Sequence, residues 1–394
     1  MIKVLLGVCS VGNGHVSRQR LIIKHLLEYN IDMTMVISQN NCDLFNSQYP
    51  NIKKIIVNRP WIVCNSMGID FEATKEKYAE YSEDLFDNFL DFSINVRKSF
   101  AGENPDYILT DYEPYVAQFA YATNVPLICL DQQSKLLNIP INTINGFSVN
   151  TENCLLNYFF PYAKKRYVSS FFKINNCRKY NIEVIPPIIK VIERKSIIKN
   201  KVVVYFSPYP SDLKDYIKIL ELIKNNQGYT FHIYTEHKFD NYNGYSNLKF
   251  KKFGDDFDDD LSDCNFIIAT SGHQLISEAI SLEIPLYLSP LATFEQNYCC
   301  YMVEKEKFGL RMRKYDQEEF ERFIALISQY RNNMKKYKSL YWKKNWDEVL
   351  FEKLEVEMNI SKNISNKSQT VDKAPLVCPK PEALFSFLVQ ESCI

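Results

Sequence analysis

The sequence predicts an α/β protein with two doubly wound parallel-sheet domains facing an interdomain cleft, followed by a C-terminal tail. Apolar runs typical of buried strands alternate with amphipathic stretches along residues 1–185, and the alternation starts again at residue 200. The 394 residues also exceed the ~250–300 that one hydrophobic core usually organises. We therefore divide the chain into an N-terminal domain (1–187), a second domain (188–357) and a tail (358–394).

The first domain follows a strand–helix–strand pattern. Its predicted strands are Ile2–Val8, Met33–Ser38, Lys53–Val57, Tyr107–Thr110 and Val125–Leu130. Its predicted helical stretches are Arg18–Leu27, Ala73–Phe100 and Pro114–Thr123. Pro186-Pro187 interrupts the pattern and is the predicted linker.

The second domain repeats this pattern. Its predicted strands are Lys201–Phe206, Tyr229–Tyr234, Leu248–Phe250, Asn265–Ala269 and Leu286–Ser289. Helices are predicted at Asp212–Lys224, at Gln274–Ser281 and between Phe294 and Trp346. In the tail, Asn359–Lys373 is polar and predicts a flexible linker, whereas the more apolar Pro375–Ile394 predicts a short segment that docks on the body.

The composition is that of a soluble globular enzyme. Apolar residues make up 46% and charged residues 24%, and the formal net charge of zero argues against general nucleic-acid binding. The 11 cysteines lack metal-type spacing, and no signal peptide or apolar run of ~18 residues occurs. We expect free thiols and a cytoplasmic protein.

The loop after the first strand predicts a ligand site. Gly12 and Gly14 allow the backbone to approach a ligand closely, and His15 falls at the start of the next helix, where an imidazole can accept a proton near neutral pH. A dinucleotide fingerprint needs a third glycine where this chain has Ser17, and an acidic residue after the second strand, where Gln39-Asn40-Asn41 stands. The loop therefore predicts group transfer, with a plain helix cap at His15 as the alternative.

A second constellation lies between residues 270 and 296. A strand ends in the small-residue turn Thr270-Ser271-Gly272-His273, whose amides open a helix and suit a diphosphate. Glu278, about one and a half turns into that helix, is placed to accept hydrogen bonds from ribose hydroxyls. Glu295 and Gln296, after the next strand, are placed to read a sugar. Together they predict a nucleotide-sugar site that needs no metal.

Three carboxylates follow strands of the first domain and are expected near an acceptor. Glu113 is predicted to position or deprotonate the acceptor, or to assist His15. Asp111 is predicted on the acceptor side, with capping of the helix that begins at Pro114 as the alternative. Asp131 is also expected to face the cleft, with a polar loop as the alternative.

Two further charged runs have simpler explanations. The aspartates between Asp255 and Asp260 precede a helix, where the dipole favours acidic residues, so we predict a helix start there and no metal site. Lys164–Tyr167, with Phe171–Lys173, forms a basic and aromatic patch. It predicts either peripheral contact with the inner face of a membrane or a strand with solvated flanks.

In patches along residues 1–345, the sequence resembles the GT-B glycosyltransferases, in the branch of the MurG-type and UDP-glucuronosyltransferase-like enzymes. The matching stretches are Gly12–Arg18, Asp111–Pro114 and Thr270–Gln296. The resemblance implies that the first domain holds the acceptor and the second holds the nucleotide sugar. The UDP preference comes from the resemblance alone.

The resemblance also implies residue roles. His15 matches a loop histidine that deprotonates the acceptor in several members, Glu278 matches the ribose-binding glutamate, and Glu295-Gln296 match the pair that contacts the donor sugar. The chain departs from the plant-type members in two places. It has Thr270–His273 where they have His-Cys-Gly-Trp, and the step from Pro290 to Glu295 is one residue longer.

The sequence thus predicts an inverting glycosyltransferase that moves a sugar from a nucleotide-sugar donor, most favourably a UDP-sugar, to an acceptor hydroxyl, without a further cofactor. A hydrolysing UDP-sugar 2-epimerase and a non-enzymatic nucleotide-sugar sensor remain alternatives. The acceptor, whether glycan, lipid-linked sugar, small molecule or protein, is not specified, because the expected acceptor loops 59–70 and 134–150 vary freely on such a scaffold.

Overall fold

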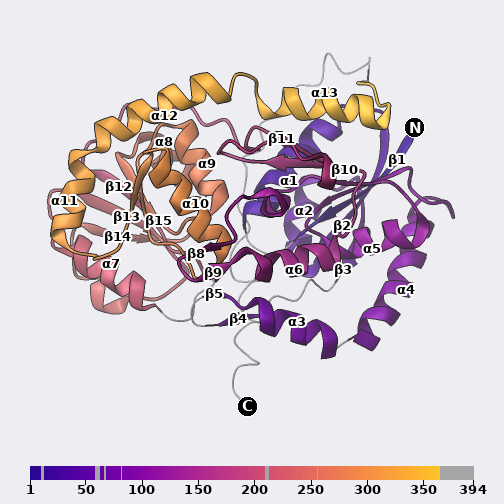
Figure 1. Cartoon of the computed structure of the whole chain (residues 1–394), viewed down its shortest axis with the longest axis horizontal. Coiled ribbons are helices and arrows are strands. Elements are labelled where there is room, and N and C mark those ends of the chain that lie inside the picture. Colours follow the sequence, from indigo (N-terminus) through magenta and orange to yellow (C-terminus); the bar gives the residue numbers. More distant parts are fainter. Residues whose placement is uncertain are drawn as a thin grey trace.

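In the computed structural model, the described residues are 1–9, 13–57, 63–65, 68–80, 82–208, 213–254 and 256–363. They form two α/β halves that lie side by side, with the first part of the chain in one half and most of the second part in the other (Figure 1). This arrangement confirms the predicted fold class.

The first half is built on a parallel sheet. Among the described residues it has seven strands in the order β11-β10-β7-β6-β1-β2-β3. The strands are β1 (Ile2–Val8), β2 (Ile31–Ser38), β3 (Lys53–Val57), β6 (Tyr107–Asp111), β7 (Leu127–Cys129), β10 (Lys165–Ser169) and β11 (Ile182–Ile185). The helices are α1 (Asn13–Leu26), α2 (Cys42–Gln48), α3 (Phe71–Glu80), α4 (Ser82–Ser99), α5 (Pro114–Thr123) and α6 (Val149–Phe159). Two antiparallel hairpins project from this half, β4 (Cys64–Asn65) with β5 (Gly68–Ile69) and β8 (Thr143–Ile144) with β9 (Phe147–Ser148).

The second half contains a six-stranded parallel sheet in the order β14-β13-β12-β15-β16-β17, again among the described residues. The strands are β12 (Lys201–Tyr205), β13 (Thr230–Tyr234), β14 (Leu248–Lys251), β15 (Phe266–Ala269), β16 (Leu286–Leu288) and β17 (Gly309–Arg311). The helices that follow are α7 (Lys214–Lys224), α8 (Asp256–Asp263), α9 (His273–Ser281), α10 (Phe294–Lys305), α11 (Gln317–Ala325), α12 (Ile327–Tyr341) and α13 (Trp346–Met358).

The central strands are apolar on both faces because helices cover both faces of each sheet. Val4, Leu5 and Leu6 are consecutive in β1 and all fully buried. Val4 and Leu6 belong to one core cluster and Leu5 to another, one on each side of the sheet. This burial explains why the strands read as continuous apolar runs in the sequence.

The last described helix returns to the first half. α13 lies over that half in Figure 1, and Trp346, Leu350 and Leu354 are buried in the same core cluster as β1 and α1. The chain then continues beside Asn30, whose N–H donates to the carbonyl of Ser361. Residues 359–363 are therefore packed and not the start of a flexible linker, while the predicted docking segment 375–394 lies outside the described residues.

Several predicted elements differ in extent from those observed. The stretch Ala73–Phe100 forms two helices, α3 and α4, and the first helix begins five residues earlier than predicted, at Asn13. Strands β11 and β17 were not predicted, and β10 was predicted only as one of two interpretations of Lys164–Tyr167. They are three to five residues long, so their patterns resemble those of loops with a few apolar residues.

The prediction that the basic and aromatic patch contacts a membrane is wrong, because most of its side chains are not exposed. Arg166, Tyr167, Phe171 and Phe172 are buried, and Arg166 donates to the carbonyl of Phe160. Lys165 pairs with Glu183. The segment is an internal strand of the sheet, which was the alternative. No helix among the described residues is both long and apolar enough to cross a membrane.

The aspartate run does begin a helix. α8 starts at Asp256, and its first turn contains Asp256, Asp258 and Asp259. Asp260, buried, accepts hydrogen bonds from Tyr234 and Lys251. Position 255 lies outside the described residues.

Candidate functional site

The strand order places two sites, one at the carboxyl edge of each sheet. In each sheet the chain starts at a central strand, adds strands toward one edge, and then returns to add strands toward the other edge. This reversal of strand order lies between β1 and β6 in the first half and between β12 and β15 in the second. Ligands of such sheets bind in the crevice beyond the strand ends at that reversal. His15 follows β1 and Asp111 ends β6, so the two residues stand on either side of the first reversal.

His15 and Asp111 form a direct pair. Nδ1 of His15 lies 2.9 Å from Oδ1 of Asp111, and both side chains are buried. Because an ionised carboxylate only accepts hydrogen bonds, Nδ1 carries the proton. The lone pair of the neutral ring is then on Nε2, the nitrogen that points away from Asp111.

Arg18 holds the other side of this carboxylate. Its Nη2 donates to Oδ1 and Oδ2 of Asp111 at 2.9 and 3.0 Å and lies 3.1 Å from Nδ1 of His15. Arg18 is fully buried. Burial alone would raise the pKa of Asp111, but the Arg18 guanidinium and the His15 ring together hold it below its usual value. Asp111 is therefore an anion with a fixed orientation.

The free nitrogen of His15 faces Gln133, at the start of the 3₁₀ turn Gln133–Asn138. Nε2 of Gln133 lies 3.2 Å from Nε2 of His15, which suits an amide N–H donating to the ring lone pair. The ring of Tyr112 stacks beside the imidazole, with the ring centroids 6.2 Å apart. The lone pair on Nε2 of His15 thus accepts a hydrogen bond from Gln133, and an incoming hydroxyl group can replace that donor.

Glu113 occupies a different place from the one predicted. Its carboxylate accepts the N–H groups of Tyr115 and Val116 at 3.1 and 2.8 Å and caps α5. Burial raises the pKa of Glu113 to about 8. The roles are exchanged: Asp111, for which capping was the alternative, contacts His15, and Glu113, expected to assist His15, is the cap.

The carboxylate of Asp131 also makes its hydrogen bonds within the protein. It accepts the N–H and the Oγ–H of Ser134 at 2.8 and 2.9 Å and so shapes the turn that presents Gln133. Burial raises the pKa of Asp131. These contacts are those of the polar-loop alternative.

The predicted donor turn has the expected geometry. Thr270 and Ser271 follow β15 and are buried, and Gly272 is the N-cap of α9. Among the described residues, which omit 10–12 and 209–212, no side chain caps the first turn of α9, and a Cβ built on Gly272 would meet nothing within 4 Å. Within this part of the chain the positive end of the nine-residue helix is therefore uncapped, which suits a diphosphate.

Glu278 lies further along α9. Its Oε1 accepts a hydrogen bond from Nε2 of Gln274 at 2.9 Å, and the same Gln274 nitrogen donates to the carbonyl of Ile188. Burial raises the pKa of Glu278 to about 7. It is half-buried, with a carboxylate that gains from hydrogen-bond donors.

His273 is not open to a ligand. Its Nε2 accepts the N–H of Phe171 at 3.3 Å, and its ring packs 5.0 Å from the ring of Phe171. It is 3% exposed, and burial, with help from the positive charge of Lys135, lowers its pKa well below the usual value. The donor-binding role predicted for His273 is therefore corrected to a contact that joins the two halves.

Glu295 and Gln296 lie at the start of α10. Gln296 Oε1 accepts the N–H groups of Ser271 and Leu291, both at 3.0 Å, and so links the donor turn to the next loop. Glu295 pairs with the buried Lys135, whose Nζ also donates to the carbonyl of Gln132. This ion pair joins the donor side to the turn that faces His15.

The two sites meet directly. A Cβ built on Gly14 would lie 3.5 Å from Cβ of Gln274, so the first turn of α1 lies against the start of α9. The predicted neighbours Gly14, His15 and the 270–274 turn are therefore together. Gly12, the other predicted glycine, lies outside the described residues.

Sequence reasoning missed the partners of His15. Arg18 was given no role beside His15, although its i,i+3 spacing places it on the same helix face. Gln133 was expected only to face the cleft together with Asp131, and Lys135, further along the same turn, gave no local signal. Their polar side chains at the end of a strand are the only hint.

The family model described as Glycosyl transferase family 1 matches residues 2–328. No curated protein matches the chain by sequence.

Several solved structures share the fold of the chain. UGT2 of Phytolacca americana, complexed with UDP-2fluoro-glucose and pterostilbene, is 12% identical, with a TM-score of 0.67 over 91% of this chain and 100% of that one. UGT89C1 of Arabidopsis thaliana, complexed with UDP-L-rhamnose, is 14% identical, with a TM-score of 0.65 over 91% and 99%. The glycotransferase of kitacinnamycin is 12% identical, with a TM-score of 0.64 over 90% and 98%.

Proposed function

The chain belongs to glycosyl transferase family 1, and from this premise we propose that it is an inverting, metal-independent enzyme that transfers a sugar from a UDP-sugar to an acceptor hydroxyl. The observation that carries the proposal is the buried His15–Asp111 pair beside the open N-terminus of α9. The choice of UDP is supported by the complexes of UGT2 and UGT89C1, which contain UDP-sugars.

His15 acts as the general base. With Nδ1–H donated to Asp111, the Nε2 lone pair accepts the proton of the acceptor hydroxyl once that hydroxyl replaces Gln133. Asp111 keeps the tautomer fixed and stabilises the imidazolium that forms. Arg18 in turn fixes the carboxylate.

The donor lies along α9. Backbone N–H groups at Gly272–Gln274 and the hydroxyl groups of Thr270 and Ser271 hold the diphosphate, and Glu278 accepts the ribose hydroxyls. Glu295 and Gln296, next to the donor turn, contact the transferred sugar. Because the helix N-terminus itself supplies positive charge, the departing diphosphate is stabilised without a metal ion.

The reaction is then a single displacement. The acceptor oxygen attacks the anomeric carbon as its proton moves to Nε2 of His15, and the bond between that carbon and the diphosphate oxygen breaks. UDP leaves with the electron pair, and the configuration at the anomeric carbon is inverted.

Incubation with UDP-sugars alone tests this function against its alternatives. A transferase releases UDP slowly through hydrolysis and faster when an acceptor is added, and its product shows the inverted anomer by NMR. A new isomer of the sugar, with no dependence on an acceptor, would identify the epimerase instead. Tight binding of a UDP-sugar without turnover, whichever acceptor is added, would identify the sensor.

A further inference from the structure

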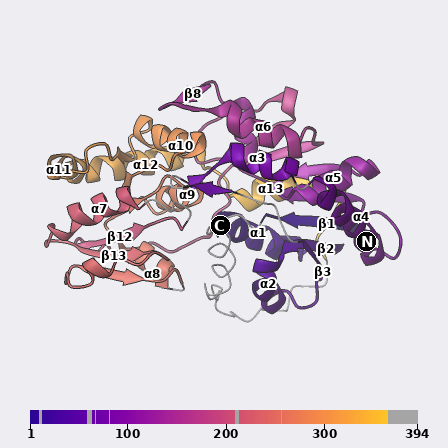
Figure 2. The same ribbon diagram turned by 90° about the horizontal axis from the view of Figure 1, so that it is seen from below.

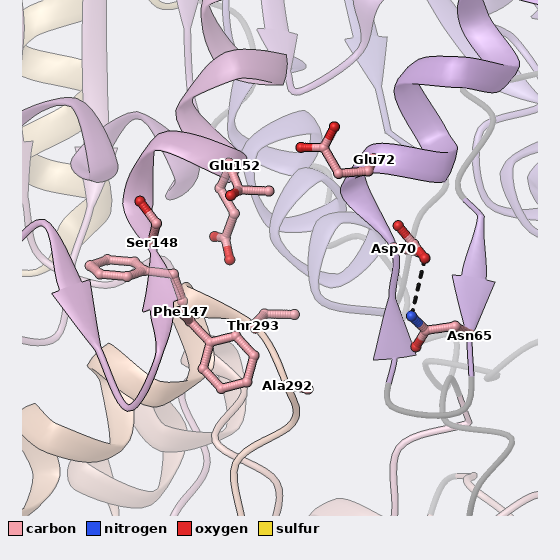
Figure 3. Close-up of a pocket in the computed structure, with 10 residues that line it drawn as sticks. Asn65, Asp70, Glu72, Phe147, Ser148, Glu152, Ala292 and Thr293 are labelled. Carbon is pink, nitrogen blue, oxygen red and sulfur yellow. Dashed lines mark hydrogen bonds between the residues drawn. The ribbon is translucent and has the colours of Figure 1, made fainter.

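A cavity lies at the junction of the two halves. It has a volume of about 160 Å³ and is lined by the β4–β5 hairpin, the starts of α3 and α6, and the loop before α10 (Figure 3). The first three elements belong to the first half and the loop to the second. Figure 2 shows the β8–β9 hairpin and α6 reaching toward α10, where Asn145 donates to Asn297 across the junction at 3.0 Å.

The cavity is connected to the catalytic groups. Glu152, in its wall, accepts the N–H of Glu295 at 3.2 Å, and Glu295 pairs with Lys135. Lys135 stands two residues after Gln133, the side chain that holds Nε2 of His15. The wall of the cavity is therefore linked to Glu295 and, through Lys135, to the turn that presents Gln133 to His15.

Seven of the ten residues that line the cavity are polar, and the described lining contains no Lys or Arg. Such a lining suits a ligand with several hydrogen-bond donors. It does not suit a flat apolar ring system, which would leave buried carboxylate and hydroxyl groups without partners.

The carboxyl groups that line the cavity already have partners within the protein. Asp70 accepts the N–H of Ala73 at the start of α3 at 3.0 Å and a hydrogen bond from Asn65. Glu152 lies at the N-terminus of α10, and Glu72 pairs with Lys75. Burial and the nearby Glu295 raise the pKa of Glu152 to about 8, whereas Asp70 accepts at the start of a helix and Glu72 has a lysine partner, so the cavity offers carboxyl acceptors without demanding a cation.

Two aromatic side chains complete the wall. Phe147, from β9, and Phe294, at the start of α10, lie among these polar groups. Aromatic faces beside carboxylates and hydroxyls match a ring that has apolar C–H faces and polar edges. The cavity is also smaller than the ~300–1,000 Å³ of sites for drug-sized ligands, so it takes one ring of a larger molecule.

We infer that the acceptor is a saccharide, one ring of which occupies this cavity and donates hydroxyl hydrogen bonds to Glu152 and Asp70. The inference rests on the proposed function and specifies its acceptor class. It separates the chain from UGT2 and UGT89C1, whose complexes contain the aromatic compounds pterostilbene and quercetin.

The test is ligand binding by saturation-transfer NMR on the full chain, with and without UDP. The probes are methyl glucoside, methyl mannoside and lactose on one side, and quercetin and 4-nitrophenol on the other. We expect binding of at least one glycoside. That binding, measured at pH 9 where Glu152 is ionised, weakens about 10- to 100-fold in Glu152→Gln, which removes a charged acceptor, and less in Thr151→Val. The exposed Glu348→Gln on α13 is the matched control and leaves glycoside binding unchanged.

The affinity for UDP distinguishes a failure of the proposed function from a failure of the saccharide inference. This affinity is expected to be unchanged in all three variants. If the wild-type chain does not bind UDP, the proposed function is contradicted instead. The saccharide inference is overturned if no glycoside binds. It is also overturned if the aromatic probes bind more tightly than every glycoside, or if Glu152→Gln binds glycosides as the wild type does.

Discussion

The base side and the donor side of the cleft are built in opposite ways. On the base side, charged groups are buried and contact one another: Arg18 and His15 both contact Asp111, while Nε and Nη1 of Arg18 have no hydrogen-bond partner among the described residues. On the donor side, the helix N-terminus at Gly272 has no side-chain cap, and Glu278 is half-buried with a raised pKa. The base side has the contacts that fix the His15 tautomer in place without a ligand, whereas the donor side, among the described residues, lacks partners for its helix N-terminus and carboxylate until an anion and hydroxyl groups bind.

The difference indicates how the work is divided. A base must be held in one tautomer before the acceptor binds, so the protein itself supplies its partners. A nucleotide binding site gains affinity when its polar groups are satisfied by the ligand and not by the protein. Substitutions on the base side should therefore change rate and folding, and those on the donor side should change nucleotide affinity.

The largest effect is expected from His15→Ala. Without a base the acceptor oxygen is a poor nucleophile, and kcat should fall by about 10²–10⁴-fold while the Kd of UDP stays the same. His25→Ala, on the same helix but in contact with surface carboxylates, is the matched control and should keep the wild-type rate. A His15 variant that transfers at the wild-type rate would end the assignment.

Asp111→Asn should lower kcat by about 10²–10³-fold, because the tautomer and the imidazolium lose their support. It should also destabilise the fold by ~3–5 kcal/mol, because Arg18 is left as an unpaired buried charge. Urea unfolding measures the second effect. In the double variant Arg18→Met/Asp111→Asn, stability should largely return while the rate does not. Recovery of both would make the carboxylate structural only.

On the donor side, Glu278→Gln should weaken UDP binding by about 10- to 100-fold at pH 8, through loss of a charged acceptor for the ribose hydroxyls. The pKa of about 7 adds a pH dependence. As the pH falls from 8 to 6, the wild-type carboxyl is protonated and its affinity for UDP declines. The Gln variant should lack this part of the decline in calorimetric titrations, so equal pH slopes in the two proteins would contradict the assignment.

The smallest effect is expected from Glu113→Gln. The amide still accepts N–H groups at the start of α5, so the unfolding free energy at pH 7 should change by only ~1 kcal/mol and the transfer rate should not change. The pKa of about 8 lies above that of the unfolded chain, so ionisation of Glu113 costs stability as the pH rises toward 8. Urea unfolding at pH 5.5 and 8.5 should show a smaller loss in the variant. A large fall in rate with intact folding would restore the catalytic role predicted from the sequence.

The sequence was most informative where a residue's role is local. The alternation of strands and helices, the turn at Thr270–Gly272 and the position of His15 at the first helix all follow from short-range patterns, and the structure contains them. A doubly wound sheet then places the strand ends together, which is why two distant segments could be predicted to share one cleft.

Roles that depend on long-range contacts were less accessible. Asp111 and Glu113 are two residues apart at the end of β6, and only the three-dimensional path of the turn decides which contacts His15 and which caps α5. His273 was taken for a ligand contact because it stands in the donor turn. Its partner Phe171 lies 102 residues away, and no local pattern reports that contact.

A crystal structure of the protein with UDP tests the central claim most directly. The account predicts the diphosphate against the backbone N–H groups at Gly272–Gln274, the ribose on Glu278, and the imidazole of His15 facing the same space beside Gly14. A nucleotide bound elsewhere, or one that leaves the start of α9 empty, would contradict it.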